Sequence, residues 1–498
     1  MKTSAVKTKQ ELNRRKAERW LDRLYFAAAL FLLPLVIRNG YFDITETKTL
    51  FFVIVSAVYL LGRAVCFIQF RASGEKPGLP RQPGELAAAC FCFISLLASV
   101  GSGFFRDSVL GTEGRWQGTA MFLLYALLYY AFGERPAEER AVVLPLCAGL
   151  SISALLAVIN HLGADPLGII RVLGSFDRGR YISTLGNINF AGAYISLTLP
   201  AAMWYLLRTD KKPARFALGA VCLLGLWAAM AVRSESAVLG VGAGVLALPF
   251  TLRREPAALR RWGLLAVGIP AAMLLYGALV RLNGAALSTL TRAALHPAIS
   301  GAVVLAGAAW YLLLRGKTGG ERKALRIYGW LLGAAAAAGA VLLLLVNTLW
   351  REAELGAAAE WLRFSDAWGT DRVMVWRHSL GFYREFILWD KLVGGGCGVL
   401  AHLDAADRLF ADAVLDAAHC EYLQILLNWG AVGLTAYLGW LVLSAAAAFR
   451  KGGALSMALT AGLIAYAVQA AVNIAQAPGI TLFFLLLAIQ RSDAGDGA

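Results

Sequence analysis

Residues 425–443, ILLNWGAVGLTAYLGWLVL, form a long run without a charged side chain. A helix needs about 20 residues to cross the hydrocarbon core of a bilayer, and this run has that length. Runs of roughly 14 to 22 apolar residues recur along the chain, each bounded by Arg, Lys, Asp or Glu. Because backbone groups in lipid must satisfy their own hydrogen bonds, the sequence predicts a spanning helix at each run.

The composition is that of a membrane protein. The chain has 498 residues, of which 59% are hydrophobic and 16% charged, and its mean hydropathy is +0.62. This excludes a water-soluble globular protein. We predict an all-α fold, a polytopic transmembrane helix bundle of about 12 to 14 spans. The predicted spans are residues 21–37, 50–68, 85–104, 118–133, 141–160, 189–207, 215–232, 236–252, 263–280, 298–314, 327–347, 423–447, 454–472 and 477–490.

The positions of Lys and Arg predict the orientation. The N-terminal segment MKTSAVKTKQELNRRKAER is rich in Lys and Arg and is expected in the cytoplasm, without a signal-peptide cleavage pattern after it. Alternate counting then places five further basic loops inside, at residues 71–81, 208–215, 253–261, 315–326 and 450–451. The net charge of +15 is explained by these loops and by contact with anionic membrane lipids, so no nucleic acid partner is implied.

The spans and loops predict the organisation of the chain. A basic cytoplasmic tail (1–20) precedes transmembrane helices 1–11 (21–347). A large extracytoplasmic segment with amphipathic helices (348–422) follows. C-terminal transmembrane helices (423–490) and a cytoplasmic tail (491–498) complete the chain, so both termini are expected in the cytoplasm.

Arginines on the predicted outer side are not explained by the inner-loop bias. An Arg near the membrane is a candidate for binding an anion, because its planar guanidinium matches phosphate oxygens with two hydrogen bonds. The alternative is a charge that reaches water from a loop or a helix end. The arginines concerned are Arg115, Arg171, Arg178, Arg180, Arg233 and Arg372.

Two asparagines open one predicted span, in LGNINFAGAYISLTLP (185–200). Asn187 and Asn189 are expected either to cap this helix or to hydrogen-bond a ligand. The small residues Ala191, Gly192 and Ala193 predict a close approach to a neighbouring helix.

Within the large outer segment, one helix is predicted to lie along the membrane surface. Its apolar stripe follows helical spacing through Val373, Trp376, Leu380, Tyr383 and Ile387. The glycine-rich stretch GGGCGVL (394–400) predicts a tight turn or a backbone that approaches another element closely.

Arg372 falls in the first turn of this helix if Thr370 or Asp371 is the N-cap. A cation is disfavoured there by the helix dipole, which suggests an anionic partner. A salt bridge to Asp366 or Asp371 explains the same position.

His419 lies at the outer end of the span that begins near residue 423. It could take up a proton near neutral pH, with Glu421 tuning it, although residues two apart do not share a helix face. A purely structural histidine remains the alternative. The histidines are scattered without the spacing of a zinc site, so no metal or other cofactor is predicted. A disulfide between Cys397 and Cys420 is a minor alternative to free thiols.

Four motifs together resemble the O-antigen ligase and polymerase superfamily of membrane glycosyltransferases. AHCEYLQILLNWGAVGLTAYL (418–438) resembles the family signature H-N-x-[YF]-L-x with its following x-G-x-x-G-L span. LGNINFAGAYISLTLP resembles G-N-x-N-x-x-A-x-x, DRVMVWRHSL (371–380) resembles R-x-x-x-W, and GTEGRWQG (111–118) matches G-x-x-x-R-x-x-G.

This resemblance implies a glycosyltransferase that moves a glycan from undecaprenyl diphosphate to an acceptor hydroxyl, outside a bacterial cytoplasmic membrane and without a metal. The acceptor would be a glycan, a lipid or a protein. His419 and Arg372 correspond to the catalytic positions. Diphosphate or glycan contacts are expected from Arg115, Arg178, Arg180, Asn187, Asn189, Arg233 and Glu421.

Two positions depart from the family pattern. Cys420 replaces the usual Asn beside His419, and Glu235 stands where the family carries an Arg. The rival interpretation is a transporter or flippase of lipid-linked glycan without transfer chemistry. A transporter usually carries charges at mid-membrane and two related halves, and neither is evident in this sequence.

Overall fold

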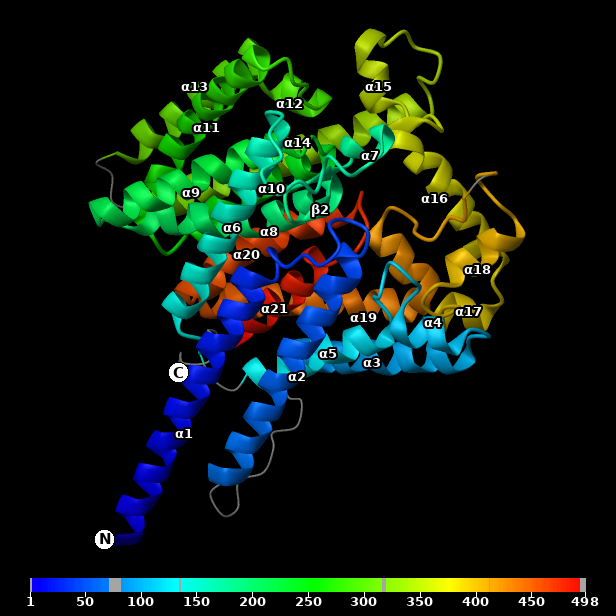
Figure 1. Cartoon of the computed structure of the whole chain (residues 1–498). Coiled ribbons are helices and arrows are strands. Elements are labelled where there is room, and N and C mark those ends of the chain that lie inside the picture. Colours follow the sequence, from blue (N-terminus) through cyan, green and yellow to red (C-terminus); the bar gives the residue numbers. More distant parts are fainter. Residues whose placement is uncertain (1, 71–81, 134–135, 316–318, 412, 493–498) are drawn as a thin grey trace.

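The computed structural model is mostly helical, with one short β-hairpin (Figure 1). Thirteen of the fourteen predicted spans coincide with an α-helix, whereas the first, 21–37, covers the end of the first helix (Lys2–Phe26), a π-helical turn (Ala27–Leu32) and the turn that follows. The predicted inner loop 71–81 and most of the predicted C-terminal tail lie outside the described residues. The structure describes residues 2–70, 82–133, 136–315, 319–411 and 413–492.

The elements follow one another in a simple order. The first half contains α1 (Lys2–Phe26), a π-helical turn η1 (Ala27–Leu32), α2 (Ile44–Phe70), α3 (Pro83–Gly101), α4 (Phe105–Leu110), α5 (Thr119–Phe132), α6 (Glu139–His161), α7 (Ser175–Arg178), β1 (Tyr181–Ile182), β2 (Gly186–Asn187), α8 (Ile188–Arg208), α9 (Lys212–Ala231) and α10 (Glu235–Thr251). The second half contains α11 (Pro256–Leu282), α12 (Thr289–Ala294), α13 (Pro297–Leu314), α14 (Glu321–Asn347), η2 (Gly356–Ala358), α15 (Ala359–Leu362), α16 (Trp368–Glu385), α17 (Leu388–Val393), α18 (Val399–Ala406), α19 (Glu421–Lys451), α20 (Ala454–Ala470) and α21 (Gly479–Ser492).

Length and composition identify a multi-pass membrane protein. Among the described helices, nine are long and apolar enough to cross a membrane: α2, α3, α6, α8, α9, α11, α13, α14 and α19. Four shorter apolar helices, α5, α10, α20 and α21, pack among them. The predicted tail 1–20 is, from Lys2 onward, the first part of α1. In Figure 1, α1 and α2 extend away from the body of the bundle.

Helix α8 lies at the centre of the bundle and is buried without a break from Ala191 to Tyr205. Small residues allow its neighbours to approach closely. A methyl group added at Gly192 would lie 2.8 Å from the Ala237 side chain of α10. One added at Gly462 of α20 would overlap the backbone of α8. The close helix approach predicted from the small residues at 191–193 is therefore confirmed.

The glycine-rich stretch approaches a break in α19. Gly430 has a positive φ of 66°, which interrupts the helix and frees carbonyl groups in the preceding turn. The amides of Gly395 and Gly396 donate to two of these carbonyls, those of Leu427 (3.1 Å) and Asn428 (2.9 Å). The predicted close backbone approach is thus confirmed, and its partner is α19.

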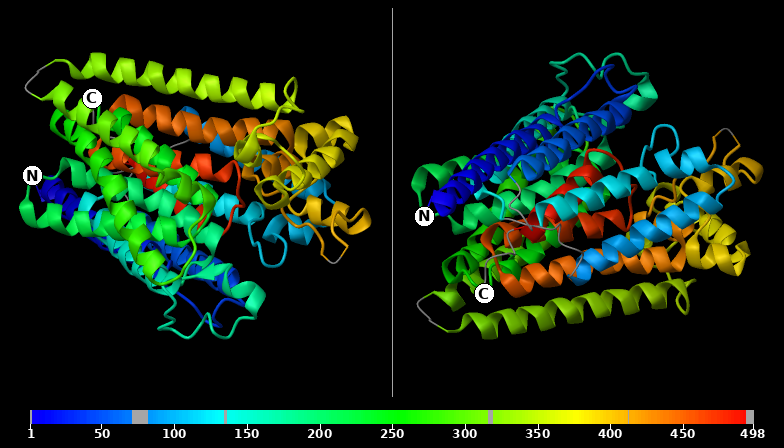
Figure 2. Two further views of the ribbon diagram at one scale, coloured as in Figure 1. Left: turned by 90° about the horizontal axis from the view of Figure 1, so that it is seen from above. Right: turned by 90° about the horizontal axis from the view of Figure 1, so that it is seen from below.

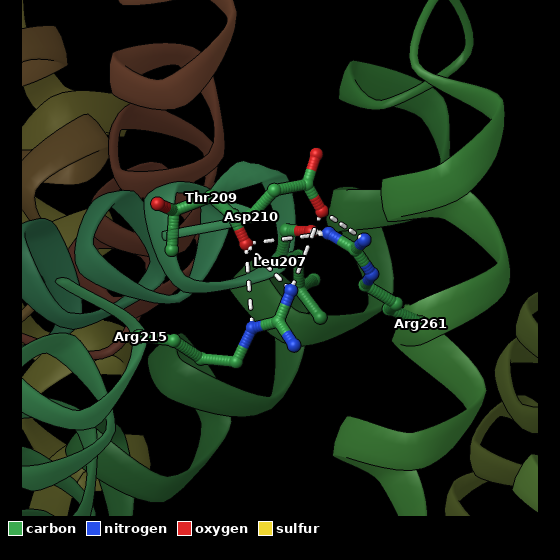
Figure 3. A network of polar contacts seen from close by, with 5 residues as sticks. All are labelled: Leu207, Thr209, Asp210, Arg215 and Arg261. Atoms are coloured by element: carbon green, nitrogen blue, oxygen red, sulfur yellow. Dashed lines mark hydrogen bonds and ion pairs between the residues drawn. The ribbon is translucent and has the colours of Figure 1, made fainter. Parts of the chain in front are cut away.

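Figure 3 shows a polar network at one end of the bundle. Asp210 lies between the guanidinium groups of Arg215 and Arg261. Arg261 also donates to the carbonyl of Leu207 at 3.0 Å. These residues join the loop after α8 to α9 and α11.

The predicted inner loops 208–215, 253–261 and 450–451 are joined at this end, which we call the basic-loop end. Further contacts there are Arg23–Glu138, Arg208–Glu139, Arg208–Glu255, Arg254 to the carbonyl of Lys451, and Arg491–Glu85. The loops predicted to face outward are joined to one another at the opposite end, which we call the His419 end. Contacts there include Arg115–Asp416, Arg233 to the carbonyl of Gly179, Glu235–Ser288 and His161 to the carbonyl of Ala286. These contacts gather several predicted inner loops at one end and several predicted outer loops at the other, and the orientation in the membrane stays a prediction.

Helix α14 lies along the edge of the bundle in both views of Figure 2. The tract AAAAAGAVLLLL (334–345) in this helix has small residues that suit close helix packing, but most of these residues are exposed. A methyl group added at Gly333 or Gly339 would meet no atom within 4 Å. Tyr328, whose hydroxyl donates to the carbonyl of Leu246 at 2.9 Å, holds α14 to α10 near the basic-loop end.

Lys48 is fully buried in α2, and its ammonium group donates to the carbonyls of Leu33 (3.0 Å), Pro34 (2.9 Å) and Val36 (2.9 Å). We expect Lys48→Met to lower the free energy of unfolding by about 3 kcal/mol, because three buried carbonyls lose their donor. Thermal unfolding of the purified protein in detergent measures this loss. Exposed Lys323→Met is the matched control, and an equal melting temperature for both variants would contradict the role of Lys48.

Candidate functional site

Arg115, in the 111–118 motif, contacts Asp416, which lies just before the 418–438 motif, at the His419 end. Arg115 lies in the loop between α4 and α5, and Asp416 lies just before α19. The guanidinium forms two hydrogen bonds with the carboxylate, at 2.8 Å from Nε and 2.6 Å from Nη2. The Asp416 side chain is 41% exposed, so this ion pair borders solvent and can open to an anion that competes for Arg115.

His419 is held by an unusual backbone. Its φ is +50°, and the residue before it donates its amide to Gln424 Oε1 at 2.8 Å. Burial, followed by the positive charges of Arg372 and Arg115, lowers the pKa of His419 to about 4, while Asp416 opposes them. The imidazole is therefore neutral at physiological pH and can accept a proton.

Glu421 does not perform the tuning role that the sequence suggested. Its side chain is 2% exposed, and its carboxylate accepts hydrogen bonds from the hydroxyls of Tyr437 and Tyr466 (2.9 Å). The pKa of His419 is set by burial, Arg372, Arg115 and Asp416, and not by Glu421. It points into the bundle and joins α19 to α20, because helical backbone from Glu421 onward directs it away from residue 419.

Arg372 begins the regular part of α16, but its N-terminus differs from the prediction. Gly369, Thr370 and Asp371 all have positive φ, so neither Thr370 nor Asp371 is a helical N-cap. The guanidinium donates to the carbonyl of Gly369, and its buried Nε has no hydrogen-bond partner among the described residues.

The salt bridge that was the alternative for Arg372 is not formed. Asp366 pairs instead with Arg377, at 2.7 Å. Burial lowers the pKa of Arg372, and the negative charge of Glu235 opposes this. Arg372 is thus a half-buried cation with an unused donor, beside the neutral imidazole of His419.

The predicted apolar stripe of α16 is only partly correct. Trp376 and Tyr383 pack against a small core beneath the segment, but Leu380 is 37% exposed and Ile387 66% exposed. The face that is buried carries Val375, Ser379 and Phe382. Helix α16 therefore rests on neighbouring protein, on a face rotated from the predicted one, because Val375 and Phe382 fill that core.

The two asparagines act as structural residues. Asn187 is the N-cap of α8, and its side chain accepts the amide of Asn189 at 2.9 Å. The Asn189 side chain accepts the hydroxyl of Ser234 at 2.7 Å. The capping alternative is confirmed for Asn187, and Asn189 ties α8 to the start of α10.

The remaining arginines differ in their surroundings. Arg178 donates to the carbonyls of Leu173 (2.9 Å) and Arg171 (3.0 Å), which stabilises its own loop. Arg233, with a φ of +51°, donates to the carbonyl of Gly179 at 2.7 Å.

The charge of Arg180 reaches the same region as that of Arg115. Burial and the charge of Asp177 raise the pKa of Tyr181, and the positive charges of Arg180 and Arg115 both oppose this. Tyr181 belongs to β1, which pairs antiparallel with β2. The short hairpin therefore brings Arg180 toward the site, whereas Arg178 is occupied in its loop.

Glu235, which stands where the resembled family carries an Arg, has a structural role. Its carboxylate accepts the hydroxyl of Ser288 (3.1 Å) and the amides of Thr289 (2.9 Å) and Leu290 (3.1 Å). An Arg at this position could not accept these hydrogen bonds. Glu235 therefore fastens the loop before α12 to the His419 end.

Sequence reasoning missed Asp416 and the polar floor of the site. A cavity of about 50 Å³ lies beside the Arg115–Asp416 pair, with Gln117 and Gln424 in its lining. Gln117 is 7% exposed, and its Nε2 has no partner among the described residues. The sequence signal for Gln117 and Gln424 was their position inside two of the quoted motifs, whereas Asp416 lies outside them.

All the non-glycine residues with positive φ in the described chain lie in or beside the motif segments. This conformation is costly for residues with a side chain and gathers at functional sites, where surrounding structure holds it in place. The residues are Trp116, Ser183, Arg233, Thr370, Asp371 and His419.

The other histidines and the cysteines of the large segment are placed elsewhere. His378 Nε2 lies 3.0 Å from the fully buried Asp404, and His402 Nε2 lies 3.2 Å from Asp107. Cys397 and Cys420 are free thiols, so the disulfide is not formed. Within the described ranges, no group of three or more His, Cys, Asp or Glu residues could hold a metal ion.

Comparison with known proteins does not assign a family. No family model matches the sequence, and no curated protein matches it significantly. The activity is therefore argued from the geometry of the His419 end.

Proposed function

We propose that this protein is an integral-membrane glycosyltransferase of the O-antigen ligase or polymerase type. It transfers or polymerises a glycan from an undecaprenyl-diphosphate donor to an acceptor hydroxyl, on the outer side of a bacterial cytoplasmic membrane. One observation supports this most: His419, Arg372 and Arg115 come from three distant segments, and both arginines act on the pKa of the histidine. A neutral base beside two cations is the arrangement that such a transfer needs.

The reaction assigns a role to each group. The acceptor hydroxyl attacks the anomeric carbon, and its proton passes to the neutral imidazole of His419. The bond between that carbon and the diphosphate oxygen breaks, and its electron pair remains on the diphosphate. Arg372 and Arg115 stabilise the resulting negative charge, Arg372 through its unused Nε and Arg115 by exchanging Asp416 for the phosphate. The acceptor is a glycan, a lipid or a protein.

The first test locates the donor in cells. We expect native-host cells that lack this protein to accumulate undecaprenyl-diphosphate glycan on the outer face of the membrane, measured by mass spectrometry after enzymatic treatment of intact cells. Complementation with the wild-type chain should clear it. Accumulation confined to the inner face would replace the transferase with a flippase, and an unchanged lipid pool would contradict both.

The orientation is a second, separate prediction. We expect a cysteine placed at exposed Glu113, at the His419 end, to react with a membrane-impermeant maleimide on intact cells. A cysteine placed at exposed Lys211, at the basic-loop end, should react only after permeabilisation. Both variants carry Cys90→Ser, because Cys90 is exposed, and Cys90→Ser alone gives the background. The reverse labelling pattern would invert the topology.

A further inference from the structure

A groove of about 640 Å³ lies at the His419 end, apart from the site described above. It is formed by the last turns of α11, by the loop 285–287 and by α12 with the start of α13. None of its lining residues is shared with the cavity beside Arg115. The groove is therefore a separate feature of this end of the molecule.

The charge of the groove is entirely positive. Arg281, Arg292 and His296 are exposed and line it, and its lining contains no Asp or Glu. Within the described residues, the side chain of Arg281 has no hydrogen bond or ion pair, and Arg292 donates only to the hydroxyl of Thr289 at 3.2 Å. His296 Nδ1 accepts the amide of Ala298 at 3.3 Å, so in the neutral ring the proton is on Nε2.

The apolar surroundings of the groove extend onto the exposed faces of α11 and α13. Leu274 is 53% exposed, Leu282 85% and Ile299 48%. In a bilayer these faces contact acyl chains, because both helices are long and apolar enough to span it. Cationic side chains thus lie directly above a surface suited to hydrocarbon.

The inner wall of the groove is fastened to the rest of the bundle. His161 Nε2 lies 2.9 Å from the carbonyl oxygen of Ala286, and Glu235 holds Ser288, Thr289 and Leu290 as described above. The loop beside the groove is therefore anchored, and the groove shares no lining residue with the cavity beside Arg115. This favours a resident lipid over a reacting donor.

We infer that this groove binds an anionic glycerophospholipid from the leaflet at the His419 end. Arg281 and Arg292 hold the phosphate, His296 donates from Nε2, and the acyl chains lie against α11 and α13. Paired guanidinium groups match phosphate oxygens, and neutral residues alone would not discriminate an anionic headgroup from a zwitterionic one. The inference does not depend on the proposed glycan transfer.

Lipid retention tests this inference. The protein is reconstituted in nanodiscs of equal phosphatidylglycerol and phosphatidylcholine, extracted in mild detergent, and its retained lipid is quantified by mass spectrometry. We expect the wild type to retain phosphatidylglycerol over phosphatidylcholine, and Arg281→Gln/Arg292→Gln to lose this preference by roughly tenfold. The control pair Arg351→Gln/Arg384→Gln removes two other exposed arginines, one in the turn after α14 and one on α16, and should retain the preference.

Further measurements distinguish the phospholipid from other phosphate-bearing ligands. Inorganic phosphate should not displace the retained lipid, because it lacks the acyl chains. Preferential retention of undecaprenyl phosphate over phosphatidylglycerol would overturn the phospholipid assignment in favour of a donor-type lipid. Equal retention by the wild type and the Arg281→Gln/Arg292→Gln variant would also overturn the phospholipid assignment, provided that thermal unfolding shows both proteins to be folded.

Discussion

Cells that carry His419→Ala in place of the wild-type chain are expected to lose glycan transfer by roughly 10²- to 10⁴-fold, because that is what proton transfer to a positioned base contributes. The imidazole is neutral at pH 7, because its pKa is about 4, and two cations, Arg372 and Arg115, act on it. The readout is the outer-face pool of undecaprenyl-diphosphate glycan at matched expression. Membrane insertion should be unchanged.

The control is His402→Ala, which removes a histidine of the same large segment that pairs with Asp107. It is expected to transfer glycan normally. Normal product from a well-expressed His419→Ala variant would refute the assignment of the base.

The pH dependence provides a second signature of His419. A base must be deprotonated, and burial with two neighbouring cations lowers the pKa of His419 to about 4. The kcat/KM of the wild type should therefore stay constant from about pH 8 down to about pH 5 and fall only toward pH 4, because kcat/KM reports the free enzyme. Bound diphosphate adds negative charge, so the acid limb of kcat should lie at higher pH. A kcat/KM limb near 6.5 would show that the base is not this buried histidine.

Arg372→Gln is expected to lower transfer by roughly 10²- to 10³-fold, the usual cost of removing one preorganised group that stabilises developing charge. Arg372→Lys should not restore activity, because an ammonium group cannot form the two parallel hydrogen bonds of a guanidinium. Initial rates with purified donor and acceptor measure the loss. Arg384→Gln, on the same helix but exposed, is the matched control.

The pH profile distinguishes loss of the Arg372 charge near His419 from general damage to the fold. Arg372 is, after burial, the largest influence that lowers the pKa of His419. Its removal should move the acid limb of kcat/KM to higher pH, toward the ordinary pKa of histidine at about 6.5. If the Arg372→Gln variant is slower but the acid limb of its kcat/KM profile does not move, Arg372 does not act on His419.

The helices could be predicted from the sequence because each apolar run has the length and boundaries of a spanning helix. The contacts among several loops at each end agree with the grouping expected from Lys and Arg, while the orientation in the membrane stays a prediction. Conformations that depend on distant partners could not be predicted. Gly430 breaks α19 because another loop supplies amides to its carbonyls, and Lys48 is buried because three carbonyls of another segment accept from it.

The sequence identified most residues of the candidate site but not how their side chains are arranged. Periodicity placed Arg372 in a helical first turn, but left-handed backbone at Gly369–Asp371 changes what its side chain faces. Glu421 was grouped with His419 by adjacency in sequence, whereas the helix turns it toward Tyr437 and Tyr466. Asp416 had no distinguishing pattern, since its role comes from a residue about 300 positions earlier in the chain.

The left-handed backbone at His419 implies a trade-off between stability and activity at one residue. Glycine adopts this conformation freely, whereas a residue with a side chain loses about 1 kcal/mol there. A chain selected for thermal resistance alone would place glycine at this position. At position 419 a glycine would therefore make the fold more stable than the histidine does. A laboratory variant stabilised in this way would have lost its base.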